Sequence, residues 1–178
     1  MAYIFQTRTF KKNIIDGTII FFLDIDGVLV HANPHQKVEL EDDGFYKFNP
    51  HAIQILKSVI YKTKDKVILS TSHRFKYSIQ GWKVIFRRRG LELKNLSILD
   101  DKAYFSNHRH TRREEILGWI QSNNLDYKEI VTIDDDKSLN DLPAHLKDRL
   151  VLTNSYTGLN DLNTLKRIVQ RRLSSKID

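Results

Sequence analysis

The sequence predicts an α/β fold in which a mostly parallel sheet is covered by helices on both faces. Short apolar runs of strand length alternate along the chain with longer segments of helical periodicity. Three of the apolar runs end directly in polar side chains, as expected for strands whose carboxyl ends face a ligand. Alternation of this kind is typical of βαβ units, which build parallel sheets.

Length and composition limit the possible classes of protein. The 178 residues suit one domain of ordinary size, so we expect a single domain over residues 1–178. The absence of cysteine excludes a disulfide framework, a thiolate zinc site and a cysteine nucleophile. No signal peptide and no apolar run of about 20 residues is found, which predicts a cytoplasmic protein without a membrane partner. The net charge of +7 favours polyanions as partners.

Two strands and two helices are expected in the first half of the chain. They are a strand at residues 20–23, a helix that opens at Asn49, a strand at residues 67–69, and a helix from Ser72 to about Arg89. Both strands are continuous apolar runs, as in sheets buried on both faces. Pro50 stands at the first helical position, where proline is favoured, and Gly90 follows the second helix as a C-cap.

Two helices and two strands are expected in the second half. Thr111 and Glu114 have the spacing of a capping box, so a helix begins there. The apolar run at residues 130–133 is a strand that three consecutive aspartates end. A strand at residues 150–152 and an amphipathic helix that begins at Asn160 or Asp161 complete the alternation.

One segment interrupts the alternation of strands and helices. Residues 37–40 and 45–48 are short alternating runs that flank a turn containing Asp43 and Gly44, which is a hairpin signal. The segment follows the first strand closely. We therefore expect a small β-hairpin flap over the end of that strand.

Asp24 and Asp26 are the most informative residues of the chain, because they follow a buried strand directly. Desolvation and mutual repulsion disfavour the charged forms of two carboxylates so placed. A hard divalent cation such as Mg²⁺ would offset both effects, since its ligands are carboxylates, waters and substrate phosphates. The sequence therefore predicts a metal site at the end of the first strand.

The other two polar strand ends extend this site. Ser70 and Thr71 follow the second strand, and Asp134 and Asp135 follow the strand at residues 130–133. Because the carboxyl ends of parallel strands share one edge of a sheet, these groups should meet the first pair of aspartates. Together they offer a nucleophile, a proton-transfer group, a hydroxyl donor and metal ligands, and Arg112 could add a cation for a phosphate.

These motifs resemble those of the haloacid dehalogenase (HAD) superfamily of phosphohydrolases. The segment Asp24-Ile-Asp26-Gly27-Val28 is similar to the first motif, Ser70 to the second, Arg112 to the third, and Ile133-Asp134-Asp135 to the fourth. The similarity spans residues 18 to about 140. It implies a Rossmann-like three-layer sandwich without a large cap domain, because neither gap between the first three motifs could hold one.

The resemblance implies a role for each motif residue. Asp24 would attack phosphorus and form an aspartyl phosphate, and Asp26 would protonate the leaving oxygen and later deprotonate the hydrolytic water. Ser70 would donate to the transferring phosphoryl group, and Arg112 would neutralise its charge. Mg²⁺ would be held by Asp24, Asp135 and the backbone carbonyl of Asp26, with Asp134 in direct or indirect contact. Substrate binding would add Gly27, whose turn aims the aspartates, with Thr71, Ser72 and Arg74.

Some assignments stay open in the sequence. The phosphate-binding hydroxyl could be Ser72 instead of Ser70, with Arg74 reaching the substrate in the manner of polynucleotide 3'-phosphatases. Arg113 competes with Arg112 for the third motif, although Arg112 lies one helical turn before an apolar position. The three consecutive aspartates at residues 134–136 leave the metal ligand ambiguous by one residue.

The resemblance predicts a Mg²⁺-dependent phosphatase that acts on a nucleic-acid end or a nucleotide. Basic clusters occur at residues 87–89, 108–113 and 166–172, and an uncapped site suits bulky phosphates. The segments at residues 116–120 and 152–159 are similar to a HAD subgroup associated with RNA repair. One alternative is a catalytically weak HAD-fold module with a nucleic-acid-binding or regulatory role. The other is a phosphatase that acts on small metabolites.

Overall fold

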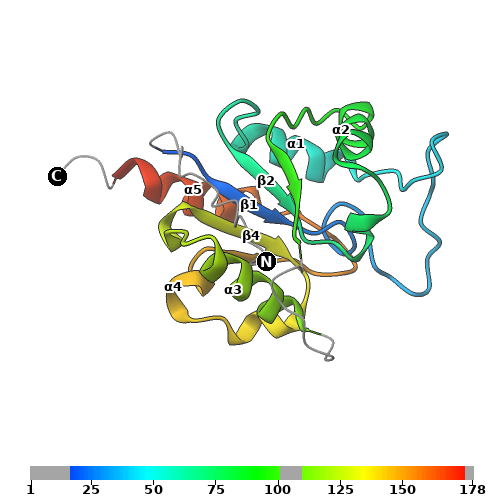
Figure 1. The fold of residues 1–178 in the computed structure, drawn as a ribbon. Helices are drawn as coiled ribbons and strands as arrows, with labels where there is room; N and C mark the ends of the chain where they lie inside the picture. The colour runs from blue at the N-terminus through cyan, green and yellow to red at the C-terminus, as the bar shows by residue number, and fades with distance from the viewer. Residues whose placement is uncertain (1–16, 101–109, 175–178) are drawn as a thin grey trace, which may run out of the picture.

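Five parallel strands form the central sheet of the computed structural model, which describes residues 17–100 and 110–174 (Figure 1). They are β1 (Ile20–Leu23), β2 (Lys66–Leu69), β3 (Leu96–Ile98), β4 (Ile130–Asp134) and β5 (Leu150–Leu152). Their spatial order is β3-β2-β1-β4-β5, so the succession of strands reverses between β1 and β4. In open α/β sheets, ligands bind at such a reversal, beyond the carboxyl ends of the strands.

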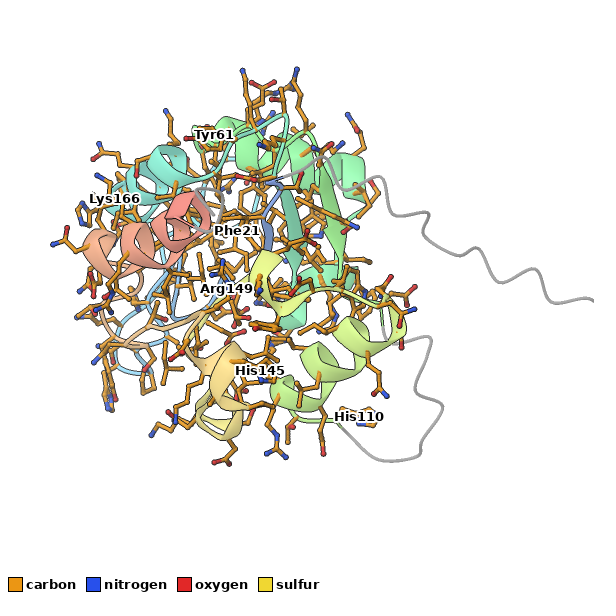
Figure 2. The ribbon with its side chains drawn as sticks, turned by 90° about the vertical axis from the view of Figure 1, so that its left-hand side faces the viewer. Phe21, Tyr61, His110, His145, Arg149 and Lys166 are labelled. Carbon is orange, nitrogen blue, oxygen red and sulfur yellow. The ribbon has the colours of Figure 1, made fainter. Side chains whose placement is uncertain are left out.

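Helices cover both faces of the sheet, which confirms the predicted three-layer α/β fold (Figure 1). One face packs against α1 (Pro50–Val59), α2 (Ile79–Arg88) and α5 (Leu162–Ser174). The other face packs against α3 (Arg112–Ser122), the short α4 (Ala144–Lys147) and the 3₁₀ turn η3 (Lys137–Asp141). A further 3₁₀ turn, η2 (Tyr127–Glu129), leads into β4. Figure 2 shows Phe21 of β1 inside the molecule and Lys166 of α5 and His145 of α4 at its surface.

The apolar runs form strands because both sides of each strand are buried. Phe21 and Leu23 of β1 pack in the core below α1, α2 and α5, whereas Ile20 and Phe22 pack below α3 and α4. All four are at most 3% exposed. Successive side chains of a strand point to opposite faces, so a strand between two helical layers needs a continuous apolar sequence.

Three predicted helix starts are confirmed. The Asn49 side chain accepts a hydrogen bond from the His51 amide at 2.9 Å and caps α1. Thr111 and Glu114 form the capping box of α3. Asp161, one of the two expected starts of the last helix, accepts a hydrogen bond from the Thr164 amide at 2.8 Å.

The predicted helix from Ser72 to Arg89 is wrong, because the chain forms two elements there. A 3₁₀ turn, η1 (Ser72–Phe75), is capped by the Thr71 hydroxyl, and α2 begins only after Ser78, whose hydroxyl accepts from the Gly81 amide at 3.1 Å. Side chains that bond to the local backbone compete with a continuous helix. Strand β3 was not predicted, since its three residues include the polar Ser97 and therefore form no continuous apolar run.

The expected hairpin is present and small. Leu40 and Tyr46 form a single antiparallel bridge, and the Glu41 amide donates to the Phe45 carbonyl at 2.8 Å. Gly44 occupies the turn with a positive φ of 74°, a conformation that favours glycine. In Figure 1 this segment projects beyond the carboxyl ends of the strands.

Within residues 17–100 and 110–174, none of the helices combines the length and the apolar character that crossing a membrane requires. Between the first two motif strands, the chain forms only the hairpin and α1. Between η1 and residue 100 it forms α2 and β3. No cap domain is therefore present in these described segments.

Candidate active site

Asp24 lies at the carboxyl end of the central strand, where the chain turns away from the sheet. Its amide donates to the Ile133 carbonyl of β4 at 3.1 Å, and its Oδ1 accepts from the Ile25 amide at 2.8 Å. Three amides of the following turn, at residues 28–30, donate to the Ile25 carbonyl. The backbone therefore fixes the Asp24 carboxylate at the edge of the sheet, with only 9% of its side chain exposed.

Gly27 allows the carboxylate of Asp135 to approach this turn. It has a positive φ of 67°, and a Cβ atom at this position would lie 2.1 Å from Asp135 Oδ2. The Gly27 carbonyl also accepts from the Thr153 hydroxyl at 2.7 Å, which ties the turn to the end of β5. A side chain at residue 27 would therefore displace Asp135 from the site.

Asp24, Asp134 and Asp135 form one acidic cluster, in which one carboxylate oxygen from each residue lies within 4.8 Å of the other two. Burial raises the pKa of Asp24 to about 6, although the Arg112 guanidinium opposes the shift. Burial and the neighbouring Asp24 raise the pKa of Asp134 to about 8, and burial also raises the pKa of Asp135. Two buried carboxylates and one half-buried carboxylate whose negative charges are disfavoured fit a hard divalent cation such as Mg²⁺.

Asp136 lies outside this cluster although it is next in sequence. Its Oδ1 accepts from the Ser138 amide at 2.7 Å and caps η3. Its own amide donates to Asp134 Oδ1 at 3.0 Å. Of the three consecutive aspartates, the structure thus brings the first two to Asp24.

Arg112, the first residue of α3, extends its guanidinium into the acidic cluster. Nη2 lies 3.9 Å from Asp24 Oδ2, and Nε lies 3.2 Å from Asp134 Oδ2. Nη1 donates to the Ser70 carbonyl and to Glu115, the latter at 2.8 Å. Arg113 does not approach the cluster in this way, and its amide donates to the Ser138 hydroxyl at 3.2 Å.

The second motif brings Ser70 to the same place. Its amide donates to the Leu23 carbonyl at 3.0 Å, and its hydroxyl lies 3.5 Å from Asp134 Oδ2. Ser70 is fully buried, whereas Ser72 is exposed on η1. Thr71 is also buried, and its hydroxyl accepts from the His73 amide at 3.3 Å.

Arg74 holds the second motif in place through its buried guanidinium. Nε donates to the Leu99 carbonyl at 2.9 Å, and Nη1 donates to the carbonyls of Ser70 and Thr71. Nη2 donates to Glu115 at 2.8 Å. In these bonds the guanidinium of Arg74 stabilises the protein itself. A contact between Arg74 and a substrate stays a prediction.

Two residues near the site were not among the site residues predicted from the sequence. Glu115 pairs with both Arg112 and Arg74, and its spacing of three from Arg112 on a helix is the only local signal for this contact. His73 places Nε2 3.1 Å from Asp26 Oδ2. That contact joins two motifs far apart in the chain, so no sequence spacing could reveal it.

One comparison with known proteins shows the family of this chain. The family model for the HAD domain in Swiss Army Knife RNA repair proteins matches residues 20–164. A comparison with curated proteins gave no match. Among solved structures, a hypothetical protein from Xanthomonas campestris is 16% identical at a TM-score of 0.44, and the alignment covers 90% of this chain and 86% of that one.

Two structures of Fcp1 are also similar to this chain. One is described as an essential RNA polymerase II CTD phosphatase, with 15% identity, a TM-score of 0.42, and coverage of 90% of this chain and 49% of that one. The other is a fission yeast Fcp1 variant bound to beryllium fluoride, with 15% identity, a TM-score of 0.40, and coverage of 90% and 51%. This chain thus spans about half the length of the two Fcp1 chains.

Proposed function

Because the chain belongs to the family of HAD domains in Swiss Army Knife RNA repair proteins, as its motifs predicted, we propose that it is a Mg²⁺-dependent phosphatase. It would hydrolyse phosphomonoesters through an aspartyl phosphate on Asp24. The observation that carries this proposal is the meeting of Asp24, Arg112 and Asp134 at the strand reversal, with distances of 3.9 and 3.2 Å from the guanidinium to the two carboxylates.

The side chains divide the reaction between them. Asp24 attacks phosphorus while the bond to the leaving oxygen breaks, and Asp26 gives that oxygen a proton. Asp26 then takes a proton from the water that attacks the phosphorus of the aspartyl phosphate. Ser70 and Arg112 bind the phosphoryl oxygens, and Arg112 offsets their negative charge.

The acidic cluster would hold the metal ion. Asp24 and Asp135 would be ligands together with the backbone carbonyl of Asp26, and Asp134 would bind directly or through water. When bound, Mg²⁺ supplies positive charge that stabilises both the carboxylates and the transferring phosphoryl group. The raised pKa values of Asp24 and Asp134 support this assignment. Burial disfavours their charged forms, and a bound cation would offset that penalty.

Hydrolysis of p-nitrophenyl phosphate tests the proposed activity. We expect turnover that requires Mg²⁺, stops with EDTA, and falls by at least about a thousandfold in Asp24→Asn, because that variant lacks the nucleophile. Asp42→Asn is the matched control, since Asp42 is exposed in the hairpin. Turnover in Asp24→Asn equal to that of the control would overturn the proposal.

We propose a nucleic-acid end as the substrate. The net charge of +7, the exposed Arg87 and Arg88 on α2, and the lack of a cap in the described segments support it. Part of the cluster at residues 108–113 lies outside the described residues, as do the side chains of residues 171 and 172. The description of the family as RNA repair proteins points the same way.

A comparison of substrates decides this point. Oligonucleotides with a 3'- or 5'-phosphate should have a higher kcat/KM than mononucleotides, and added salt should remove the advantage. Faster turnover of mononucleotides or sugar phosphates would instead identify a small-metabolite phosphatase. Binding of oligonucleotides without hydrolysis would identify a binding or regulatory module.

A further inference from the structure

We propose that His73 is the positioning residue for Asp26. Its imidazole would orient the carboxyl group of Asp26 so that one oxygen carries the transferred proton toward the leaving group. The inference rests on the proposed function, in which Asp26 is the proton-transfer group. It assigns a role in that reaction to a residue outside the motif positions given above.

The geometry places His73 Nε2 3.1 Å from Asp26 Oδ2. The backbone of His73 is fixed in η1, because its amide donates to the Thr71 hydroxyl and its carbonyl accepts from the Lys76 amide at 2.8 Å. The two side chains are 29% and 35% exposed, so they lie at the mouth of the site and not in the core. A substrate can therefore reach Asp26 while His73 holds it.

The hairpin fixes the plane of the imidazole. Tyr46 lies with its ring 5.4 Å from the His73 ring at an angle of 82°, and Phe45 lies 5.9 Å away at 83°. Phe45 is itself anchored, being 1% exposed and packed edge-on against Trp82 at 5.2 Å. Edge-to-face contacts of this kind have a preferred geometry, so the ring has few orientations available.

The fixed imidazole gives the two oxygens of Asp26 different roles. In the tautomer with a proton on Nε2, this N–H would be the donor to Oδ2 across the 3.1 Å separation, which would leave Oδ1 as the oxygen that carries the exchangeable proton. As the bond from phosphorus to the leaving oxygen breaks, that oxygen keeps the electron pair and takes the proton from Oδ1. His73 keeps its own proton throughout, and the later attack by water returns a proton to Oδ1.

Leaving groups of different quality provide the test. Phenolate leaves poorly without a proton, whereas p-nitrophenolate leaves readily, so only phenyl phosphate depends strongly on Asp26. His73→Leu should lower kcat/KM about tenfold or more for phenyl phosphate, and less than about threefold for p-nitrophenyl phosphate. His73→Gln, whose amide N–H reaches about as far as Nε2, should stay within about threefold of the wild type. His73→Asn, whose amide is too short, should behave like His73→Leu.

A double-mutant cycle shows whether His73 acts through Asp26. In an Asp26→Asn background, His73→Leu should change kcat/KM for phenyl phosphate by less than about twofold. The proposal is overturned if a folded His73→Leu variant loses the same factor in kcat/KM on both esters, or if His73→Gln and His73→Asn lose the same factor on phenyl phosphate. It is also overturned if His73→Leu lowers kcat/KM as much in the Asp26→Asn background as in the wild type. Thermal melting shows whether each variant is folded. If His73→Leu does not fold, the comparison of His73→Gln with His73→Asn tests the proposal instead. Wild-type turnover no higher than that of Asp24→Asn would overturn the proposed function itself.

Discussion

Asp24 and Asp26 leave the same strand two residues apart but lie in different surroundings. The Asp24 side chain is 9% exposed and faces two further carboxylates and a guanidinium, whereas the Asp26 side chain is 35% exposed and faces His73. With Arg112 and a bound metal ion beside it, the Asp24 carboxylate would be ionised, whereas a carboxyl group at the mouth of a site can exchange protons with substrate and water. Their surroundings thus fit a nucleophile and a proton shuttle.

At the residue scale, we expect the neighbouring aspartates Asp135 and Asp136 to contribute differently to Mg²⁺ binding. Asp135→Asn should weaken Mg²⁺ binding by at least about tenfold, because it removes a charged ligand. Asp136→Asn is the matched control and should change binding by less than about twofold, since asparagine also caps helical turns. The rise of the melting temperature with Mg²⁺ concentration measures the Mg²⁺ affinity of each variant. A greater loss in Asp136→Asn than in Asp135→Asn would reverse the assignment of the ligands.

The sequence could predict the site residues that follow strands, because a parallel sheet brings its strand ends together. It left open the choice between Ser70 and Ser72 and the choice between Arg112 and Arg113, since the two candidates lie only two residues apart in the first case and one in the second. The burial of Ser70 and the contacts of Arg112 favour the first of each pair. The catalytic roles of all these residues stay proposals.

Among the structural elements, the hairpin is held mainly by Arg89 at the end of α2, while Arg88 Nη1 lies farther away, 3.7 Å from Asp43 Oδ2. Arg89 donates from Nη1 and Nη2 to the two oxygens of Asp43, both at 2.8 Å, and from Nε to the Tyr46 carbonyl. It lies over the rings of Phe45 and Phe48 as well. The basic cluster at residues 87–89 therefore contains one arginine that stabilises the protein.

The pairing of Asp43 with Arg89 makes the free energy of unfolding depend on pH in the acidic range. Hydrogen bonds from Arg89 lower the pKa of Asp43 from 3.8 to about 2. Because the folded-state pKa lies below the ordinary value, the contribution of the pair to stability is complete above about pH 5 and is lost as the pH falls toward 2. Asp43→Asn should lower the free energy of unfolding by about 1–2 kcal/mol at neutral pH.

Chemical unfolding at a series of pH values checks this prediction. The difference between the wild type and Asp43→Asn should shrink as the pH falls from about 5 to about 2. Asp42→Asn, an exposed neighbour, serves as the control. A difference that stays constant over this pH range would show that the ion pair contributes nothing.

Elements with strong local signals were predicted, and those that depend on tertiary contacts were not. The caps at Asn49 and Thr111 are local hydrogen bonds, so their sequence pattern was sufficient. The break after Phe75 involves the local caps at Thr71 and Ser78, and it also accompanies the burial of Arg74, which donates to Leu99 and Glu115. Such long-range contacts have no periodic signature in the sequence.

In the whole molecule, the order of the strands places the site. Because β1 lies between β2 and β4, the residues after these three strands meet at one point of the sheet edge. The alternation of elements predicted a parallel sheet, but the spatial order follows from packing that the sequence does not display. That the whole chain forms one domain stays a prediction.

The central claim is that Asp24 becomes phosphorylated, and mass spectrometry of acid-quenched enzyme tests it most directly. After a brief reaction with p-nitrophenyl phosphate and Mg²⁺, we expect a phosphoryl group on Asp24, absent from Asp24→Asn. It should be increased in Asp26→Asn, because p-nitrophenolate leaves without a proton from Asp26, whereas removal of the base slows hydrolysis of the aspartyl phosphate. A phosphoryl group on Asp26, or the same labelling in Asp24→Asn, would contradict the account.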